Sequence, residues 1–352
     1  QNLKWEFFSK NQSMKLVNQR ILVWLLGFML LFSAAWVFIG KYIYETAANV
    51  NGECWGNLSN RPDRFHSRFW GIRTEHDLSE WWFGDYQEVE LTLENEALRI
   101  SAWVREAEGN APWILFIHGL GSCKNNHAVL LPAAMMVRQG YSVMLLDMRE
   151  HGASSRINQL HTAGQEELHD VLNGWRWIHE KKGIPAEEIG VYGVSLGAGT
   201  VALAFAEEPR IHAAWLDSPF ADMEKIIRSE LQIAGFPAFL AGGAKFAGLL
   251  FSGIDIMGRT PLEGAESIGN RHLFIAHGKQ DERIPVFHGE LMCETANAFM
   301  LEDGSVECWY PSGQVTVGED KTTGHAVAML TELEEWNHQM KEFFGRTLNH
   351  QN

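Results

Sequence analysis

The stretch "GVYGVSLGAG" at residues 190–199 places a serine between two glycines, after a short apolar run and before an alanine-rich one. The first run is typical of a β-strand and the second of a helix. Ser195 lies between the predicted strand and the predicted helix, within a Gly-x-Ser-x-Gly pattern formed with Gly193 and Gly197. A strand that turns directly into a helix holds such a serine in a strained conformation with its hydroxyl projecting, and the glycines avoid clashes. Ser195 is therefore the candidate nucleophile.

A serine hydroxyl is a weak nucleophile, so it needs a base, and the base needs an acid that orients it. Asp281 lies in the loop "AHGKQDERIP", and His325 lies in "TTGHAVAML", before the last helical stretch. The order Ser195, Asp281, His325 is the one expected for a serine at such a strand-to-helix turn. Asp217, in "WLDSPF", is the alternative acid, but we expect it to support its loop through hydrogen bonds.

The reaction also needs two backbone N–H groups that stabilise the oxyanion. One is expected from Leu196, directly after the nucleophile, at the start of a helix. The other is expected from the loop after the apolar run "WILFIHG", where Leu120 follows the His-Gly pair. The oxyanion hole is therefore predicted at the amides of Leu120 and Leu196.

Short apolar runs alternate with helical stretches through most of the chain. The runs cover residues 113–118, 141–147, 189–194, 212–217, 272–277 and 305–310. The helical stretches between them cover residues 126–139, 164–182, 196–207 and 286–299. Continuous apolar runs separated by helices predict a mostly parallel sheet with helices on both faces. Alternating apolar residues at 86–93 and 98–104 predict an antiparallel pair at one edge of that sheet.

Six motifs together resemble the α/β-hydrolase superfamily, in particular its esterase/lipase-like group of serine aminopeptidase-type and monoacylglycerol-lipase-like members. They are "HGLGSCKNN", "LLDMREHGAS", "GVSLG", "DSPF", "HGKQDERIP" and "GHA". The resemblance covers about residues 86–345 and implies the α/β-hydrolase fold with a Ser-His-Asp triad. One departure is Glu150, which stands where relatives commonly have a turn glycine. We expect it to alter a surface loop and to leave catalysis intact.

A long segment separates the apolar runs at 212–217 and 272–277 and contains "IAGFPAFLAGGAKFAGLLFSGI" at 233–254. A second membrane span is disfavoured here by Pro237, Lys245 and five glycines. We expect a helical cap or lid insertion over about residues 220–265. A packed helix pair without a lid function is the alternative.

The chain carries a candidate membrane anchor at residues 21–40, which contain no charged residue. A helix of this length spans roughly the 30 Å hydrocarbon core. Four basic residues and one acid precede it in residues 1–20, which predicts a cytoplasmic tail. The connector at 41–85 and the hydrolase domain at 86–348 are then expected on the extracytoplasmic side, periplasmic or extracellular. A signal sequence is the alternative, although its apolar part should run only about 7–15 residues.

The four cysteines lack the spacing of a metal site, and no HExxH pattern is present, so we expect no metal. In an oxidising compartment disulfides can form. Cys293 and Cys308 lie in a predicted helix and in the strand after it, so a bridge between them is geometrically possible. We favour two separate buried thiols for this pair.

The composition narrows the function further. A formal net charge of −15 argues against nucleic acid as a partner, because its phosphates require a basic face. We predict a cofactor-free, membrane-anchored serine hydrolase, carboxylesterase- or lipase-like, that cleaves a small-molecule ester with an apolar acyl group through an acyl-enzyme. The alternatives are a peptidase or amidase of the same fold, a thioesterase, which would predict a cytoplasmic domain, and a catalytically dead binding protein, which the complete triad disfavours.

Overall fold

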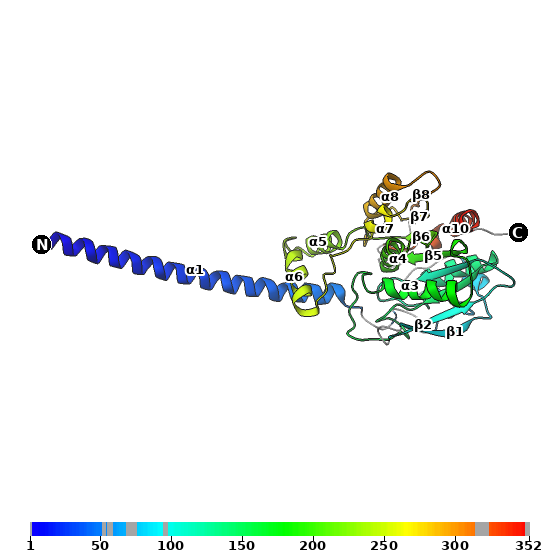
Figure 1. The fold of residues 1–352 in the computed structure, drawn as a ribbon, viewed down its shortest axis with the longest axis horizontal. Helices are drawn as coiled ribbons and strands as arrows, with labels where there is room; N and C mark the ends of the chain where they lie inside the picture. Colours follow the sequence, from blue (N-terminus) through cyan, green and yellow to red (C-terminus); the bar gives the residue numbers. More distant parts are fainter. Residues whose placement is uncertain are drawn as a thin grey trace. The chain divides into compact units, whose positions relative to one another are not determined.

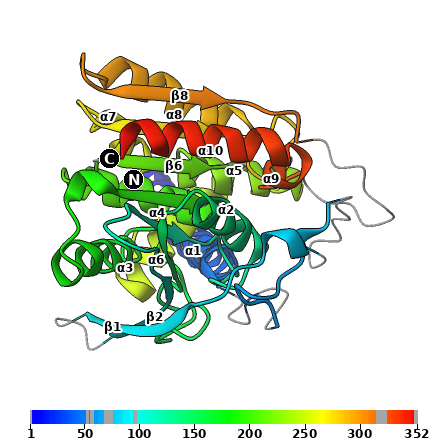
Figure 2. The same ribbon diagram turned by 90° about the vertical axis from the view of Figure 1, so that its right-hand side faces the viewer.

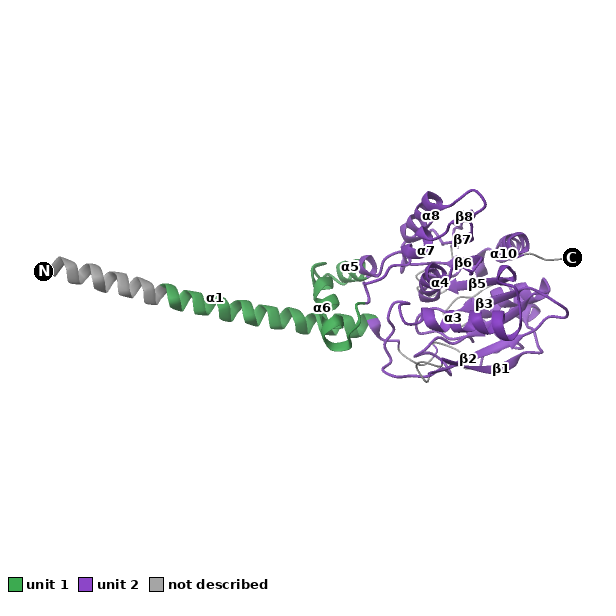
Figure 3. Ribbon diagram, viewed as in Figure 1, with its two compact units in different colours: residues 1–47, 227–255 green, residues 48–226, 256–352 purple. Residues whose placement is uncertain are grey.

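The computed structural model describes residues 2–50, 54, 59–67, 76–93, 98–313 and 324–348, with only the backbone described for residues 2–17. The chain divides into two compact units (Figure 3). Unit 1 comprises residues 1–47 and 227–255, and unit 2 comprises residues 48–226 and 256–352. The connector expected at 41–85 lies partly outside the described residues.

Unit 2 is built on an eight-stranded sheet with the order β1-β2-β4-β3-β5-β6-β7-β8 (Figures 1 and 2). The strands are β1 (Gln87–Leu93), β2 (Leu98–Arg105), β3 (Trp113–Ile117), β4 (Ser142–Leu146), β5 (Ile189–Val194), β6 (Ala213–Asp217), β7 (His272–Ala276) and β8 (Ser305–Trp309). β2 runs antiparallel to β1 and β4, and all other neighbours are parallel. The predicted fold class is confirmed, including the antiparallel pair at the edge. Every residue of β3, β4, β5 and β6 is buried, as their apolar runs require.

Helices cover both faces of this sheet. One layer contains α2 (His127–Arg138), α9 (Ala328–Thr331) and α10 (Leu333–Thr347), and the other contains α3 (Leu168–Arg176), α4 (Leu196–Glu207), α7 (Leu262–Glu266) and α8 (Phe287–Phe299). Alternate residues of a strand point to opposite faces. Phe116 of β3 accordingly joins the core with α2 and α10, while its neighbour Leu115 faces Gly174 of α3. Short turns of helix complete the unit at η2 (Leu78–Trp81), η3 (Trp177–Lys181) and η4 (Ala186–Glu188).

Two disulfides cross-link unit 2. Cys293 of α8 is bonded to Cys308 of β8 with a Cα–Cα distance of 6.2 Å, so the expectation of two separate thiols is wrong. The packing of α8 against β7 and β8 brings the two within the usual disulfide range. The second bond joins Cys54 to Cys123 across 69 residues. This pairing could not be predicted from the sequence, because nothing local indicates that the connector meets the loop after β3.

Unit 1 combines the long helix α1 (Asn2–Ala48) with α6 (Leu240–Ser252) and most of α5 (Met223–Ile233). Residues Asn18–Ala48 are long and apolar enough to cross a membrane, a property that a signal sequence shares. α6 packs closely on the C-terminal part of α1: a Cβ added at Gly40 would lie 2.2 Å from the backbone of Gly243. Glycine at both positions therefore allows the two helices to touch at the backbone.

Candidate active site

Ser195 lies at the turn between β5 and α4. Its φ of 56° and ψ of −120° lie in a region that side-chain-bearing residues rarely adopt. Its backbone N–H donates to the carbonyl of Asp217 at 2.8 Å. A Cβ at Gly193 would lie 2.4 Å from the carbonyl oxygen of Gly197, and a Cβ at Gly197 would lie 2.4 Å from that of His118. The two glycines are thus needed for the turn, as the sequence pattern predicts.

The structure brings the three predicted triad residues together from separate parts of unit 2. The Nε2 atom of His325 lies 2.8 Å from the Oγ of Ser195. On the other side of the ring, Nδ1 lies 2.6 Å from Oδ2 of Asp281. The second carboxylate oxygen of Asp281 accepts backbone N–H bonds from Arg283 at 3.0 Å and Ile284 at 2.8 Å. The imidazole therefore bridges the hydroxyl and a carboxylate that the following turn holds in place.

Asp281 is buried but ionised. Burial alone would raise the pKa of its carboxyl group, but the charge of His325 and hydrogen bonds from His277 and His325 lower that pKa well below its ordinary value. His277 Nε2 lies 3.5 Å from the carboxylate. A permanent negative charge is what an acid needs in order to stabilise an imidazolium.

Asp217, the alternative acid, lies at the end of β6, and its side chain is hydrogen-bonded to residues outside the predicted triad. Its carboxyl oxygens are 2.9 Å from the hydroxyl of Ser218 and 3.1 Å from that of Tyr192. Burial raises the pKa of this carboxyl group to about 7. Among the described residues, no hydrogen bond joins it to His325, and its contacts agree with the expected supporting role.

The predicted oxyanion residues flank the serine. Leu120 lines a small pocket of about 40 Å³ together with Gly119, Ser195 and His325. Gly119 allows the loop after β3 to approach, because a Cβ there would lie 3.1 Å from the Cβ of Ser195. Leu196 is the first residue of α4, so its N–H belongs to the unpaired amides of a helix N-terminus.

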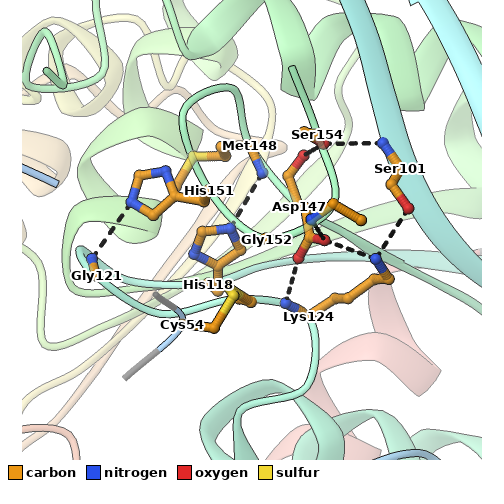
Figure 4. The surroundings of a disulfide bond; sticks show 12 residues. Cys54, Ser101, His118, Gly121, Lys124, Asp147, Met148, His151, Gly152 and Ser154 are labelled. Atoms are coloured by element: carbon orange, nitrogen blue, oxygen red, sulfur yellow. Dashed lines mark hydrogen bonds and ion pairs between the residues drawn. A yellow bond between two sulfur atoms is a disulfide. The ribbon is translucent and has the colours of Figure 1, made fainter. Parts of the chain in front are cut away.

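The turn after β4 holds the loop that carries Leu120 (Figure 4). The N–H of Gly121 donates to Nε2 of His151 at 3.3 Å. The N–H of Lys124 donates to Asp147 at 2.7 Å, and its ammonium group donates to the same carboxylate at 2.6 Å. Cys123 of this loop is also bonded to Cys54 of the connector. These contacts could not be predicted from the sequence, since the motif containing Asp147 and His151 indicates a fold family but not what its side chains bind.

His118 and His151 are structural histidines in this clamp. His118 accepts the N–H of Met148 through Nε2 at 3.1 Å, and its Nδ1 lies 2.8 Å from the carbonyl oxygen of Gly119. Burial lowers the pKa of both histidines. Both rings therefore stay neutral, with one nitrogen as acceptor and one as donor.

Glu150, the departure from the common motif, is buried with a φ of 65°. Its carboxylate accepts backbone N–H bonds from Ile157 and Gln159 at 2.8 Å each. The residues that it holds, 157–159, are exposed. Glu150 thus shapes a surface loop, as expected, but does so from beneath it.

The comparisons with known proteins agree with this architecture. Residues 112–261 match the family described as alpha/beta hydrolase fold. A thiohydrolase of Aspergillus aculeatus is 30% identical over 129 residues, which are 36% of this chain and 39% of the relative. An uncharacterized 31.7 kDa protein of Escherichia coli is 30% identical over 153 residues, which are 42% of this chain and 52% of the relative. The chain therefore spans about half or less of the curated relatives that it matches.

Solved structures extend the likeness over most of the chain. An esterase of Pyrococcus furiosus is 23% identical with a TM-score of 0.59, and the match covers 78% of this chain and 97% of the esterase. An acylaminoacyl peptidase of Pyrococcus horikoshii is 17% identical with a TM-score of 0.52, covering 76% of this chain and 42% of the peptidase. At these identities the likeness concerns the fold alone. The chain has the α/β-hydrolase fold, so the superfamily resemblance is confirmed, while the narrower group remains a prediction.

Proposed function

We propose that this hydrolase-fold protein is a serine hydrolase of carboxylic esters. The observation that carries the proposal is the contact of Ser195 Oγ with His325 Nε2 at 2.8 Å, backed by Asp281 at 2.6 Å. His325 accepts the serine proton as the oxygen attacks the acyl carbon, and the leaving alcohol takes that proton. A water molecule, activated by the same imidazole, then releases the acid and regenerates the serine.

Asp281 and the two leucine amides complete this mechanism. The carboxylate accepts the proton on Nδ1 of His325, so that Nε2 faces the serine as a base. The amides of Leu120 and Leu196 donate to the oxyanion of the tetrahedral intermediate. Asp217 takes no part in proton transfer, since its own hydrogen bonds go to Ser218 and Tyr192.

The pocket beside Ser195 supports an ester with an apolar acyl group. Its apolar lining residues are Leu120, Ala128, Val194 and Ala326. Arg283 is the only Lys, Arg, Asp or Glu side chain among the described residues that line it. A peptidase that grips a free amino terminus needs a carboxylate there, which disfavours an aminopeptidase. The thiohydrolase relative makes a thioester substrate the second candidate.

We also propose that α1 is an uncleaved single-span anchor. Its basic N-terminal tail would then lie in the cytoplasm and unit 2 on the extracytoplasmic side. Two disulfides in unit 2 support an oxidising compartment. Alkaline phosphatase fused after residue 50 should be active. An inactive fusion together with an active cytoplasmic reporter at the same site would reverse the topology, and release of a shortened soluble protein would indicate a cleaved signal.

The substrate class is tested by one panel of p-nitrophenyl esters from acetate to palmitate, alongside an acyl thioester and an aminopeptidase substrate. Turnover of the esters that exceeds turnover of the other two supports the proposal. Ser195→Ala serves as the matched control and should abolish turnover of every substrate that the site handles. Faster thioester hydrolysis would make the protein a thioesterase, and amide cleavage alone would make it a peptidase.

A further inference from the structure

Unit 1 exposes an unusual number of large apolar side chains. In the insertion they are Ile233, Phe236, Phe239, Phe246, Leu249, Leu250 and Phe251, each between 47% and 74% exposed. Single exposed apolar residues are ordinary, but a concentration of them marks a surface that contacts another apolar phase. Residues 231–254 contain one charged residue, Lys245, and its ammonium group lies 3.0 Å from Asp255. The segment is therefore nearly as poor in charge as residues 21–40 of α1, which contain no charged residue.

This apolar segment lies against one end of the candidate span. The ring of Phe246 packs on Trp36 with centroids 6.2 Å apart. Further along the two helices, Gly243 meets Gly40, and Tyr44 lies against Gly248. The uncharged stretch of α1 covers residues 21–40, and Trp36 lies four residues before its end. Four residues correspond to about 6 Å along a helix. α6 thus overlaps the last turn of that stretch and continues beyond it.

Cationic and aromatic side chains cluster at the same level of unit 1. Lys41 forms an ion pair with Glu45, and its ammonium group lies 5.6 Å from the ring centroid of Phe251. Tyr42, one residue further, is 70% exposed. Lysines that extend toward water and aromatic rings at the headgroup level are typical of a membrane boundary. The residues beside α6 therefore resemble the end of a membrane span.

We propose that α6 and the end of α5 with the turn that follows it, residues 233–239, insert into the interface of the lipid bilayer beside α1. We assign lipid as the partner of the exposed apolar face of α6, because this face continues the exposed apolar surface of α1 at Phe38 and Ile39. An overlap of about 6 Å matches the 5–10 Å to which interfacial helices penetrate. The inference rests on the anchor proposed above. It assigns the insertion a membrane contact in addition to any role as a lid.

Photolabelling of the full chain tests this inference. The protein is reconstituted in phosphatidylcholine vesicles that contain phosphatidylcholine with a diazirine in one acyl chain, and labelled peptides are mapped by mass spectrometry after irradiation. We expect lipid adducts on α1 and on residues 233–251. Exposed apolar residues of unit 2 provide the internal control. Ile157, Phe299 and Leu301 are 52–68% exposed and should remain unlabelled.

The outcomes separate the insertion from the anchor. Labels on α1 alone would overturn the inference and leave the anchor intact, whereas labels on neither would overturn both. Cross-links from 233–251 to a second copy instead of lipid would also overturn it. In Leu250→Glu, labelling of α6 should fall about tenfold because a carboxylate resists entry into the bilayer. Ile157→Glu is the matched control and should leave the labelling and the hydrolysis of a soluble ester unchanged.

Discussion

The carboxyl ends of β6 and β7 each present a buried aspartate, and the two behave in opposite ways. Asp217 is the last residue of β6, and Asp281 lies in the loop after the neighbouring parallel strand β7, at the same edge of the sheet. Burial raises the pKa of Asp217 to about 7, whereas the pKa of Asp281 lies far below its ordinary value. Removal from water opposes ionisation at both sites. Their hydrogen-bond partners therefore decide which of them can serve as the acid of a triad.

The partners of Asp217 suit a neutral acid. The hydroxyl of Tyr192 lies 3.1 Å from Oδ2 of Asp217 and 3.2 Å from the carbonyl oxygen of Ala128. Tyr192 has one proton to donate. If Asp217 is protonated, it donates to Tyr192, which in turn donates to Ala128, and every group is satisfied. Asp281 instead receives two backbone N–H bonds and faces His325, so its charge is compensated.

The largest expected effect comes from exchanging these acids for amides. Asp281→Asn should lower kcat by on the order of 10³ to 10⁴, because the amide favours the wrong tautomer of the histidine. Asp217→Asn is the matched variant one strand away and should lower kcat by less than about tenfold. Steady-state kinetics on one p-nitrophenyl ester, with circular dichroism as a check on folding, compares the two. The reverse ranking would move the catalytic acid to β6.

The second effect concerns how stability depends on pH. The folded state holds the proton of Asp217 more tightly than the unfolded state, where the pKa of the carboxyl group has its ordinary value of 3.8. The stabilisation from this proton is present below about pH 4 and is lost as the pH rises to about 7. An asparagine does not titrate, so the variant keeps its stability as the pH rises. The difference in free energy of unfolding between Asp217→Asn and wild type should therefore shift in favour of the variant by up to about 4 kcal/mol between pH 4 and pH 7.

Urea denaturation of both proteins at pH 4 to 8 measures that difference. The pKa of Asp170 is also raised to about 7 by burial, but this group is the same in both proteins and cancels. A stability difference that does not change with pH would mean that Asp217 is ionised in the folded state. The proposed contrast between β6 and β7 would then fail.

The smallest effect is expected at Tyr192. Tyr192→Phe removes the hydroxyl that links Asp217 to Ala128 and should lower the free energy of unfolding by about 1 kcal/mol. Turnover should be unchanged, since the hydroxyl contacts no residue of the proposed triad. A loss of kcat comparable to that of Asp281→Asn would show that the β6 site takes part in the reaction.

The sequence predicted what local pattern and chain order determine. Buried strands such as β5 are continuous apolar runs, and the turn at Ser195 requires the glycines that flank it. Asp281 and His325 could be selected because each follows a strand in the expected order. Their distances from each other and from Ser195 agree with that selection, and their roles remain predictions.

Features that depend on distant contacts could not be predicted. Cys54 meets Cys123 only because the connector folds back to the loop after β3. Cys293 and Cys308 are close in sequence, but the bond depends on how α8 packs against β8. The surroundings of Asp217 likewise include Tyr192, which is 25 residues away in the chain. No periodicity of the sequence encodes these contacts.

The central claim, that Ser195 is a nucleophile activated by His325, is tested most directly with a fluorophosphonate probe. The probe reacts covalently with an activated serine, and peptide mapping identifies which one. We expect one adduct, on Ser195, in the wild-type protein and none in Ser195→Ala, with both proteins equally folded. An adduct on another serine, or labelling that persists in Ser195→Ala, would contradict the claim.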